Sequence, residues 1–189
     1  MKAKDNPYRV ERIHSLPFLF SDQDFDRFYQ VVEDHNFRGA IVGPHGSGKT
    51  TLVENLIKEF QSRQIQITHC RLKDDGQSAN YIRLRKWIDQ APSDSILILD
   101  SAGLLSWWKW RGLLKESAKY KGLIITTHQP GRLTTLINTK PTFETLQSVI
   151  VHLKIAESPS KSHLIELFNK HRGNIRECLR ELYDEFAGV

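Results

Sequence analysis

The alternation of apolar and polar positions predicts short buried strands separated by amphipathic helices. The predicted strands are compact apolar runs or strict alternations, and they cover residues 40–42, 64–72, 95–100, 123–127 and 133–138. The predicted helices carry apolar residues three and four positions apart, and they cover residues 21–33, 49–60, 78–90 and 104–120. Ser21 is the proposed cap of the first of these helices, and Leu104, Trp107, Leu114 and Ala118 share one face of the last. Strands that alternate with helices of this length are typical of an α/β fold with a parallel sheet.

The two ends of the chain follow other patterns. Residues 5–20 contain two prolines and several aromatic residues, which predicts an extended lead-in and argues against a helix. From Pro141 onward the apolar spacing is wholly helical and forms three successive faces. We therefore expect one domain over residues 1–140 and a small helical subdomain over residues 141–189.

A phosphate-binding motif lies between the first buried strand and the helix after it. Gly43, four further residues and then Gly48-Lys49-Thr50 have the spacing of the P-loop, G-x-x-x-x-G-K-[ST]. Glycines let backbone N–H groups point toward a polyphosphate, and the following helix N-terminus adds partial positive charge. We expect Lys49 to bridge the β- and γ-phosphates and the Thr50 hydroxyl to hold Mg²⁺. The predicted nucleotide-binding segment is Gly43, Pro44, His45, Gly46, Ser47, Gly48, Lys49, Thr50 and Thr51. The alternative is a glycine-rich turn with an incidental lysine.

Two polar residues stand where later strands end. Asp100 closes the apolar run at residues 95–99, and His128 follows the strand at 123–127. In an open parallel sheet, ligands bind at the carboxyl ends of the strands. Asp100 is therefore the candidate Walker-B aspartate that holds Mg²⁺ with Thr50, and His128 is the candidate contact for the γ-phosphate. A turn histidine without a role is the alternative for His128.

The order of motifs separates ATP-binding from GTP-binding P-loop proteins. Residues 100–103 fit the D-x-x-G of GTPases, but Asn169-Lys170 continues as His171-Arg172 and does not supply N-K-x-D. A complete strand and helix also lie between the P-loop and Asp100, which favours the ATPase branch. We expect a P-loop NTPase fold, a three-layer α/β/α structure with a parallel sheet and a small C-terminal helical lid, that binds ATP and Mg²⁺.

From about residue 30 to residue 186 the chain resembles AAA-type ATPases. Residues 126–130, Thr-Thr-His-Gln-Pro, are similar to that family's sensor-1 segment, and residues 173–176, Gly-Asn-Ile-Arg, to its sensor-2 motif. The resemblance implies that His128 senses the γ-phosphate and that Arg176 reaches the phosphates, for which a guanidinium is well suited. A solvated helix residue is the alternative for Arg176. Arg132 is a weaker candidate, by position, for an arginine that acts in trans.

The sequence departs from this family directly after Asp100. Most such ATPases have a glutamate there to orient the attacking water, whereas this chain continues Ser101-Ala102-Gly103. Loss of a positioned base typically costs about 10²–10⁴-fold in rate. An ATPase with another water-positioning residue, an ATP-gated switch and a non-hydrolysing binding module all stay open. So does a small-molecule or nucleotide kinase, because Arg172, Arg176 and Arg180 suit a closing lid.

Composition limits the remaining choices. The 189 residues suit one globular domain with a small appendage, and the net charge of +5 permits contact with nucleic acid. The segment Trp107–Arg111 interleaves tryptophans with basic residues, which favours either packing or docking of a protein or nucleic-acid partner.

No apolar run reaches the ~20 residues of a membrane span, and the N-terminus lacks a secretory apolar region. Two cysteines, Cys70 and Cys178, fit a reduced cytoplasmic protein better than a disulfide. The sequence does not indicate the oligomeric state.

Overall fold

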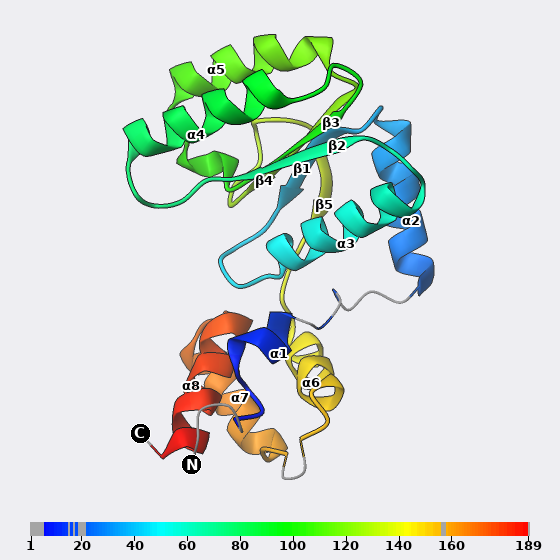
Figure 1. Cartoon of the computed structure of the whole chain (residues 1–189). Helices are drawn as coiled ribbons and strands as arrows, with labels where there is room; N and C mark the ends of the chain where they lie inside the picture. The colour runs from blue at the N-terminus through cyan, green and yellow to red at the C-terminus, as the bar shows by residue number, and fades with distance from the viewer. Residues whose placement is uncertain (1–5, 15, 17, 19–21, 156–157, 189) are drawn as a thin grey trace. The chain divides into compact units, whose positions relative to one another are not determined.

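The computed structural model describes residues 6–14, 16, 18, 22–155 and 158–188. The chain divides into two compact units, which we describe separately (Figure 1). The sheet unit comprises Phe20–Gly43 and Leu52–Asn138, and the helical unit comprises Met1–Leu19, Pro44–Thr51 and Thr139–Val189. The functional division into residues 1–140 and 141–189 stays a prediction.

A five-stranded parallel sheet forms the centre of the sheet unit. The strands are β1 (Arg38–Val42), β2 (Ile67–Arg71), β3 (Ile96–Asp100), β4 (Gly122–Thr127) and β5 (Thr135–Asn138), in the order β2-β3-β4-β1-β5. All four strand pairs are parallel. Every residue of β3 and β4 is buried, which explains why these two segments are continuous apolar runs instead of alternating ones. The predicted parallel sheet is confirmed.

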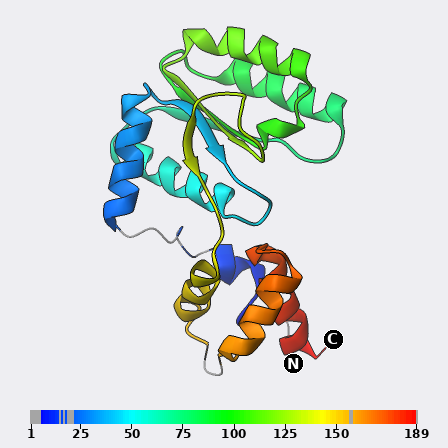
Figure 2. The ribbon, with the colours of Figure 1, turned by 180° about the vertical axis from the view of Figure 1, so that it is seen from behind.

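Helices cover both faces of this sheet. Figure 1 shows α4 (Gln77–Gln90) and α5 (Trp107–Glu116) on one face, with α2 (Asp22–Asp34) and α3 (Lys49–Ser62) on the other; Figure 2 shows the same layers from behind. Leu84 and Ile88 of α4 share a core with Leu97 and Leu99 of β3. The predicted three-layer α/β/α architecture is therefore the observed one.

The predicted helix at residues 104–120 is broken into three pieces, η2 (Ala102–Leu104), α5 and η3 (Ser117–Lys119). Its predicted apolar face included Trp107 and Leu114, but these side chains are 56% and 36% exposed, and α5 instead buries Trp110 and Leu113. The reason is local: a 3₁₀ turn ends at Leu104, and the extended residues Leu105 and Ser106 separate it from α5. A helical phase counted from residue 104 therefore does not carry over into α5.

The helical unit packs α6 (Phe143–His152), α7 (Lys161–Lys170) and α8 (Ile175–Ala187) around one apolar core, which confirms the three C-terminal helices. The prediction of a wholly extended lead-in was wrong, because α1 (Val10–His14) is helical. Asn6 accepts a hydrogen bond from the backbone N–H of Tyr8 (2.9 Å), and the Tyr8 ring is buried in this core. The prolines at positions 7 and 17 flank α1 without interrupting it. The proposed helix cap at Ser21 lies outside the described residues.

Two general expectations can be compared with the described residues. No helix among them has the length and apolar character needed to cross a bilayer. Cys70 and Cys178 are both free and buried. Burial raises the pKa of each thiol to about 11, so both stay protonated and unreactive near neutral pH.

Candidate functional site

The P-loop begins where β1 ends, at the tip of the sheet. The backbone N–H of Gly43 donates to the carbonyl of Thr127 at the end of β4 (3.2 Å). His128, the next residue, places its Nδ1 atom 3.3 Å from the carbonyl oxygen of Gly43. The sheet unit thus brings the predicted sensor histidine beside the first residue of the P-loop, because β1 and β4 are parallel neighbours in register.

The rest of the P-loop belongs to the helical unit. Gly46 and Gly48 adopt positive φ values of 72° and 82°, a region that side chains rarely tolerate. Lys49 is only 8% exposed, and its ammonium group donates to the carbonyl of Pro44 within the loop (2.6 Å). The Ser47 hydroxyl is hydrogen-bonded to that of Thr139 (2.7 Å), so a side chain from the start of the C-terminal segment anchors the loop.

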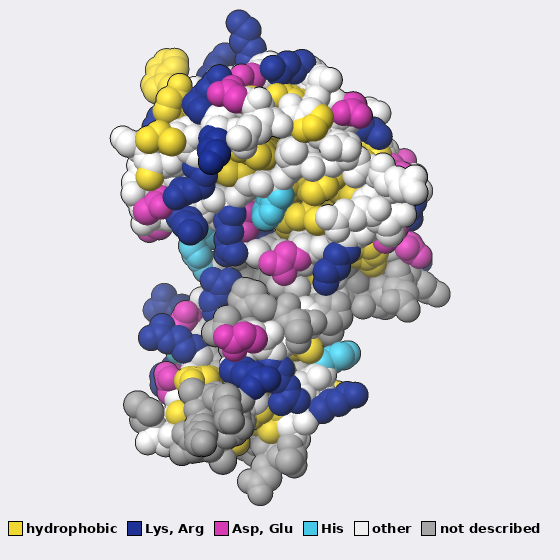
Figure 3. All heavy atoms as spheres, in the orientation of Figure 1, with side chains coloured by type: hydrophobic (Ala, Val, Ile, Leu, Met, Phe, Trp, Pro, Cys, Tyr) yellow, Lys and Arg dark blue, Asp and Glu magenta, His cyan; other side chains and the backbone are white. Residues whose placement is uncertain are grey.

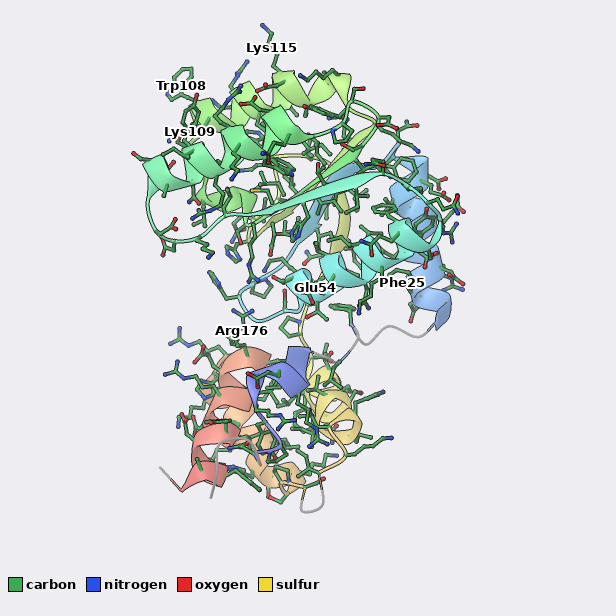
Figure 4. The ribbon with its side chains drawn as sticks, in the orientation of Figure 1. Phe25, Glu54, Trp108, Lys109, Lys115 and Arg176 are labelled. Atoms are coloured by element: carbon green, nitrogen blue, oxygen red, sulfur yellow. The ribbon has the colours of Figure 1, made fainter. Side chains whose placement is uncertain are left out.

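The start of α8 lies against the P-loop. A Cβ atom added to Gly46 would fall 1.9 Å from Asn174 Oδ1 and 3.3 Å from the backbone nitrogen of Arg176. Asn174 also caps α8, since its side chain accepts from the N–H of Glu177 (3.3 Å). Arg176 is exposed on the first turn of α8 (Figure 4). The helical unit therefore places the sensor-2-like segment at the P-loop, and Asn174 is a contact that the sequence analysis did not identify.

An aromatic ring from the lead-in also contacts the loop. A Cβ atom on Gly48 would lie 2.7 Å from Cε2 of Phe18. Glycine at position 48 is therefore required by packing as well as by its positive φ.

Asp100 occupies the predicted strand end and is 1% exposed. Its Oδ1 accepts from the Thr126 hydroxyl (2.5 Å), and the same hydroxyl accepts from the backbone N–H of Ser101 (2.8 Å). Its Oδ2 lies 3.4 Å from Nε of Arg71, the residue that pairs with Asp100 in the β2–β3 register. The Thr126 hydroxyl and the Arg71 guanidinium therefore hold this buried carboxylate in one orientation. Sequence reasoning missed Thr126 and Arg71, because only the strand order makes them neighbours of Asp100.

Further titratable groups surround this carboxylate on the same face of the sheet. His69 is two residues before Arg71 on β2, so both side chains point to the face that carries α3. Burial lowers the pKa of His69, while the charges of Asp100 and of Glu54 on α3 oppose this effect (Figure 4). Glu54 is a carboxylate near this region that the sequence analysis did not consider.

The donor set around Asp100 fits one kind of metal ion. Among the described residues, no group of three histidine, cysteine or acidic side chains is arranged to hold a metal. A transition-metal centre built from protein ligands alone therefore has no basis in this part of the chain. Mg²⁺ is commonly held by one or two oxygen side chains together with substrate phosphates and water, and the Asp100 carboxylate is an oxygen ligand of that kind.

Arg132 is held within the sheet unit. Its guanidinium donates to the carbonyl of Leu105 (2.6 Å) and lies 5.3 Å from the ring centroid of Trp110. Burial lowers the pKa of this arginine. These contacts give Arg132 a packing role and do not support an arginine that reaches another molecule.

A family model agrees with this arrangement. The model of the ATPase family associated with various cellular activities (AAA) matches residues 40–145, more than half of the chain, from β1 through the start of α6. The chain belongs to this family of P-loop ATPases. No curated protein sequence matches it.

Two proteins of known structure share the fold. Cdc6p from Pyrobaculum aerophilum superposes with a TM-score of 0.60 at 12% identity, over 97% of this chain and 66% of the other. Domain III of the Thermotoga maritima replication initiation protein DnaA superposes with a TM-score of 0.54 at 15% identity, over 97% and 91%. At these identities the likeness shows the fold alone.

Proposed function

We propose that this protein binds Mg-ATP through residues 43–51 and uses the nucleotide to control its action on a macromolecular partner. The observation that carries the proposal is the contact between Gly46 and the start of α8. A nucleotide bound by the loop would alter the surroundings of Asn174 and Arg176 directly. Closure of a lid in response to a nucleotide is a common way to couple binding to a partner surface.

Each residue at the site receives one role in this proposal. Lys49 exchanges its bond with the Pro44 carbonyl for the β- and γ-phosphates, and Arg176 adds a second cationic contact. Thr50 and Asp100 hold Mg²⁺, which neutralises phosphate charge. His128 contacts the γ-phosphate from the end of β4. The predicted lid over residues 141–189 carries Arg176, and the Trp107–Arg111 region faces the partner.

Slow hydrolysis is part of the proposal. Position 101, directly after Asp100, is a serine, so the family's adjacent glutamate has no counterpart there. A positioned base contributes about 10²–10⁴-fold, so an enzyme without one turns over slowly unless another group serves. An ATP-gated switch in a reduced, cytoplasmic setting agrees with these features. A small-molecule kinase is the second candidate, on the basis of Arg172, Arg176 and Arg180 in the lid.

The test combines ATP binding with phosphate release, for the wild type and Lys49→Ala. We expect the wild type to bind Mg-ATP and the variant to lose most binding, because the buried ammonium is the main cationic group of the loop. Phosphate release that disappears in the variant supports an ATPase. Binding without release supports a switch, and transfer of label to an added acceptor supports a kinase. A folded wild type that does not bind ATP would contradict the proposal.

A further inference from the structure

The outer surface of α4 and α5 exposes large apolar side chains that the core does not use. Of the eight exposed large hydrophobic side chains among the described residues, five lie on these two helices. Trp108 is 81% exposed, Trp107 56% and Tyr81 47%. Burial of such rings is normally favourable, so a cluster of them on one surface marks a binding site. We call the group formed by Tyr81, Lys86, Trp107, Trp108, Arg111 and Lys115 the α4–α5 surface.

This surface is also strongly basic. The helices α4 and α5 carry six basic and two acidic side chains, which accounts for most of the net charge of +5 of the whole chain. Both acidic residues, Asp89 and Glu116, form ion pairs with Arg85 (3.0 and 2.7 Å). The positive charges of Lys86, Arg111 and Lys115 are therefore left to attract an anionic partner. Figure 3 shows basic and apolar side chains side by side over these helices.

Basic side chains contact two of the aromatic rings, Tyr81 across the two helices and Trp107 within α5. Lys109 donates to the carbonyl of Gln77 on α4 (2.8 Å), and its Nζ lies 5.2 Å from the centroid of the Tyr81 ring. The Arg111 guanidinium lies 5.9 Å from the centroid of the Trp107 ring. Trp108 and Lys115 both project outward from α5 (Figure 4). A surface ordered before binding loses less conformational entropy when a ligand arrives.

Gly112 adds a separate observation. It lies inside α5, one turn after Trp108, where glycine lowers helix stability. Its φ is not positive, and a Cβ atom there would meet nothing within 4 Å. Neither backbone conformation nor packing within the described residues explains this glycine. It leaves bare backbone beside an exposed indole, where a flat group can approach closely.

We propose that the α4–α5 surface binds single-stranded nucleic acid. Bases stack on Trp107 and Trp108, and phosphates lie near the basic side chains between them. A duplex keeps its base faces stacked inside the helix and offers none to an exposed indole, so the aromatic rings favour a single strand. An acidic protein would match the charge, but it would not need aromatic faces in particular. The inference rests on the proposed function in that it names the class of the macromolecular partner.

The test measures the fluorescence anisotropy of a labelled oligothymidylate of about 15 nucleotides, without ATP and at low salt. We expect binding that Trp108→Ala weakens about 5- to 100-fold, in line with the loss of one stacked base. Trp108→Phe should retain most of the affinity, whereas Trp108→Leu should not, because only an aromatic ring stacks. Lys115→Ala should lower the slope of log affinity against log salt by about 0.7. Lys58→Ala, an exposed lysine on α3 across the sheet, is the matched control and should bind like the wild type.

Several results would overturn the proposal. They are absence of binding by the folded protein at low salt, equal affinity for a duplex of the same length, equal affinity for polyglutamate, and equal binding by Trp108→Leu and Trp108→Phe. ATP binding by the same preparation is measured in parallel. Nucleic-acid binding without ATP binding refutes only the nucleotide function, and ATP binding without nucleic-acid binding refutes only this surface.

Discussion

The P-loop and the Asp100 strand end, which we assign to one function, are held in place by opposite means. In the P-loop the decisive feature is the absence of a side chain, because Asn174 fills the space that a Cβ on Gly46 would need. At Asp100 the decisive feature is the presence of partners, because Thr126 and Arg71 engage one carboxylate oxygen each. The comparison shows two ways of fixing a site. The P-loop is held by close packing of its backbone against α8, whereas the Asp100 side chain is held by partners that the register of neighbouring strands places beside it.

The largest effect is expected for Gly46→Ala, because it should lower both stability and ATP binding. The new methyl group would overlap the Asn174 amide while the backbone is held at φ 72°, so either the loop or the start of α8 must move. We expect a loss of about 1–3 kcal/mol in the free energy of unfolding, together with weaker ATP binding. Urea denaturation followed by circular dichroism measures the first effect, and an ATP titration measures the second.

A double-mutant cycle identifies the source of that loss. Asn174→Ala alone removes a helix cap and should cost about 0.5–2 kcal/mol. If the clash with Asn174 is the cause, the double variant will lose less stability than the sum of the single variants. Strict additivity would assign the effect to backbone strain and weaken the contrast with Asp100.

The next effect is expected for Thr126→Val, which keeps the shape of the side chain and removes its hydroxyl. Asp100 would lose its hydrogen bond to Oδ1, and the N–H of Ser101 would lose its acceptor. A cost of about 1–3 kcal/mol in stability is expected for buried groups left without partners. Thr127→Val is the matched control, because the Thr127 hydroxyl donates to the carbonyl of Gln129 and not to the Asp100 carboxylate. Equal costs for the two variants would show that the carboxylate is not specially held.

Gly112→Ala should change stability in the other direction. Position 112 lies inside α5, has ordinary helical φ, and has open space around it. Alanine should therefore raise the free energy of unfolding by about 0.5–1 kcal/mol. The variant serves as the control glycine for Gly46→Ala in the same urea experiment. Destabilisation instead would reveal a structural need for glycine on this exposed face.

The smallest effect is expected in the pH dependence of stability, through Glu181 of the helical unit. Hydrogen bonds from Lys170 and His171 lower the pKa of Glu181 below its ordinary value of 4.5. The folded state therefore binds this proton less readily than the unfolded state, so the contribution is present above pH 4.5 and is lost as the pH falls through the folded pKa. Glu181→Gln should flatten the dependence of the urea midpoint on pH in that acidic range.

The sequence was informative where a functional feature consists of residues that are consecutive in the chain. The P-loop spacing, the strand that ends in Asp100 and the segment 173–176 could all be located, because each consists of consecutive residues with a known chemistry. The sequence did not show that Thr126 contacts Asp100 or that Asn174 contacts Gly46. Thr126 is 26 residues from Asp100, and Asn174 is 128 residues from Gly46, so only the strand order and the packing of α8 bring each pair together. The wrong apolar face at residues 104–120 has a local cause instead, since the extended residues Leu105 and Ser106 interrupt the predicted helix.

The positions of the tryptophans have a practical consequence for spectroscopy. All four lie between residues 87 and 110, within the sheet unit. Trp87 and Trp110 are buried, while Trp107 and Trp108 are exposed. Tryptophan fluorescence excited near the red edge of the indole band therefore reports on this unit alone. Its spectrum combines the emission of two buried and two solvent-exposed tryptophans. A single tryptophan placed in α6 or α7 would give the other unit an optical signal of its own.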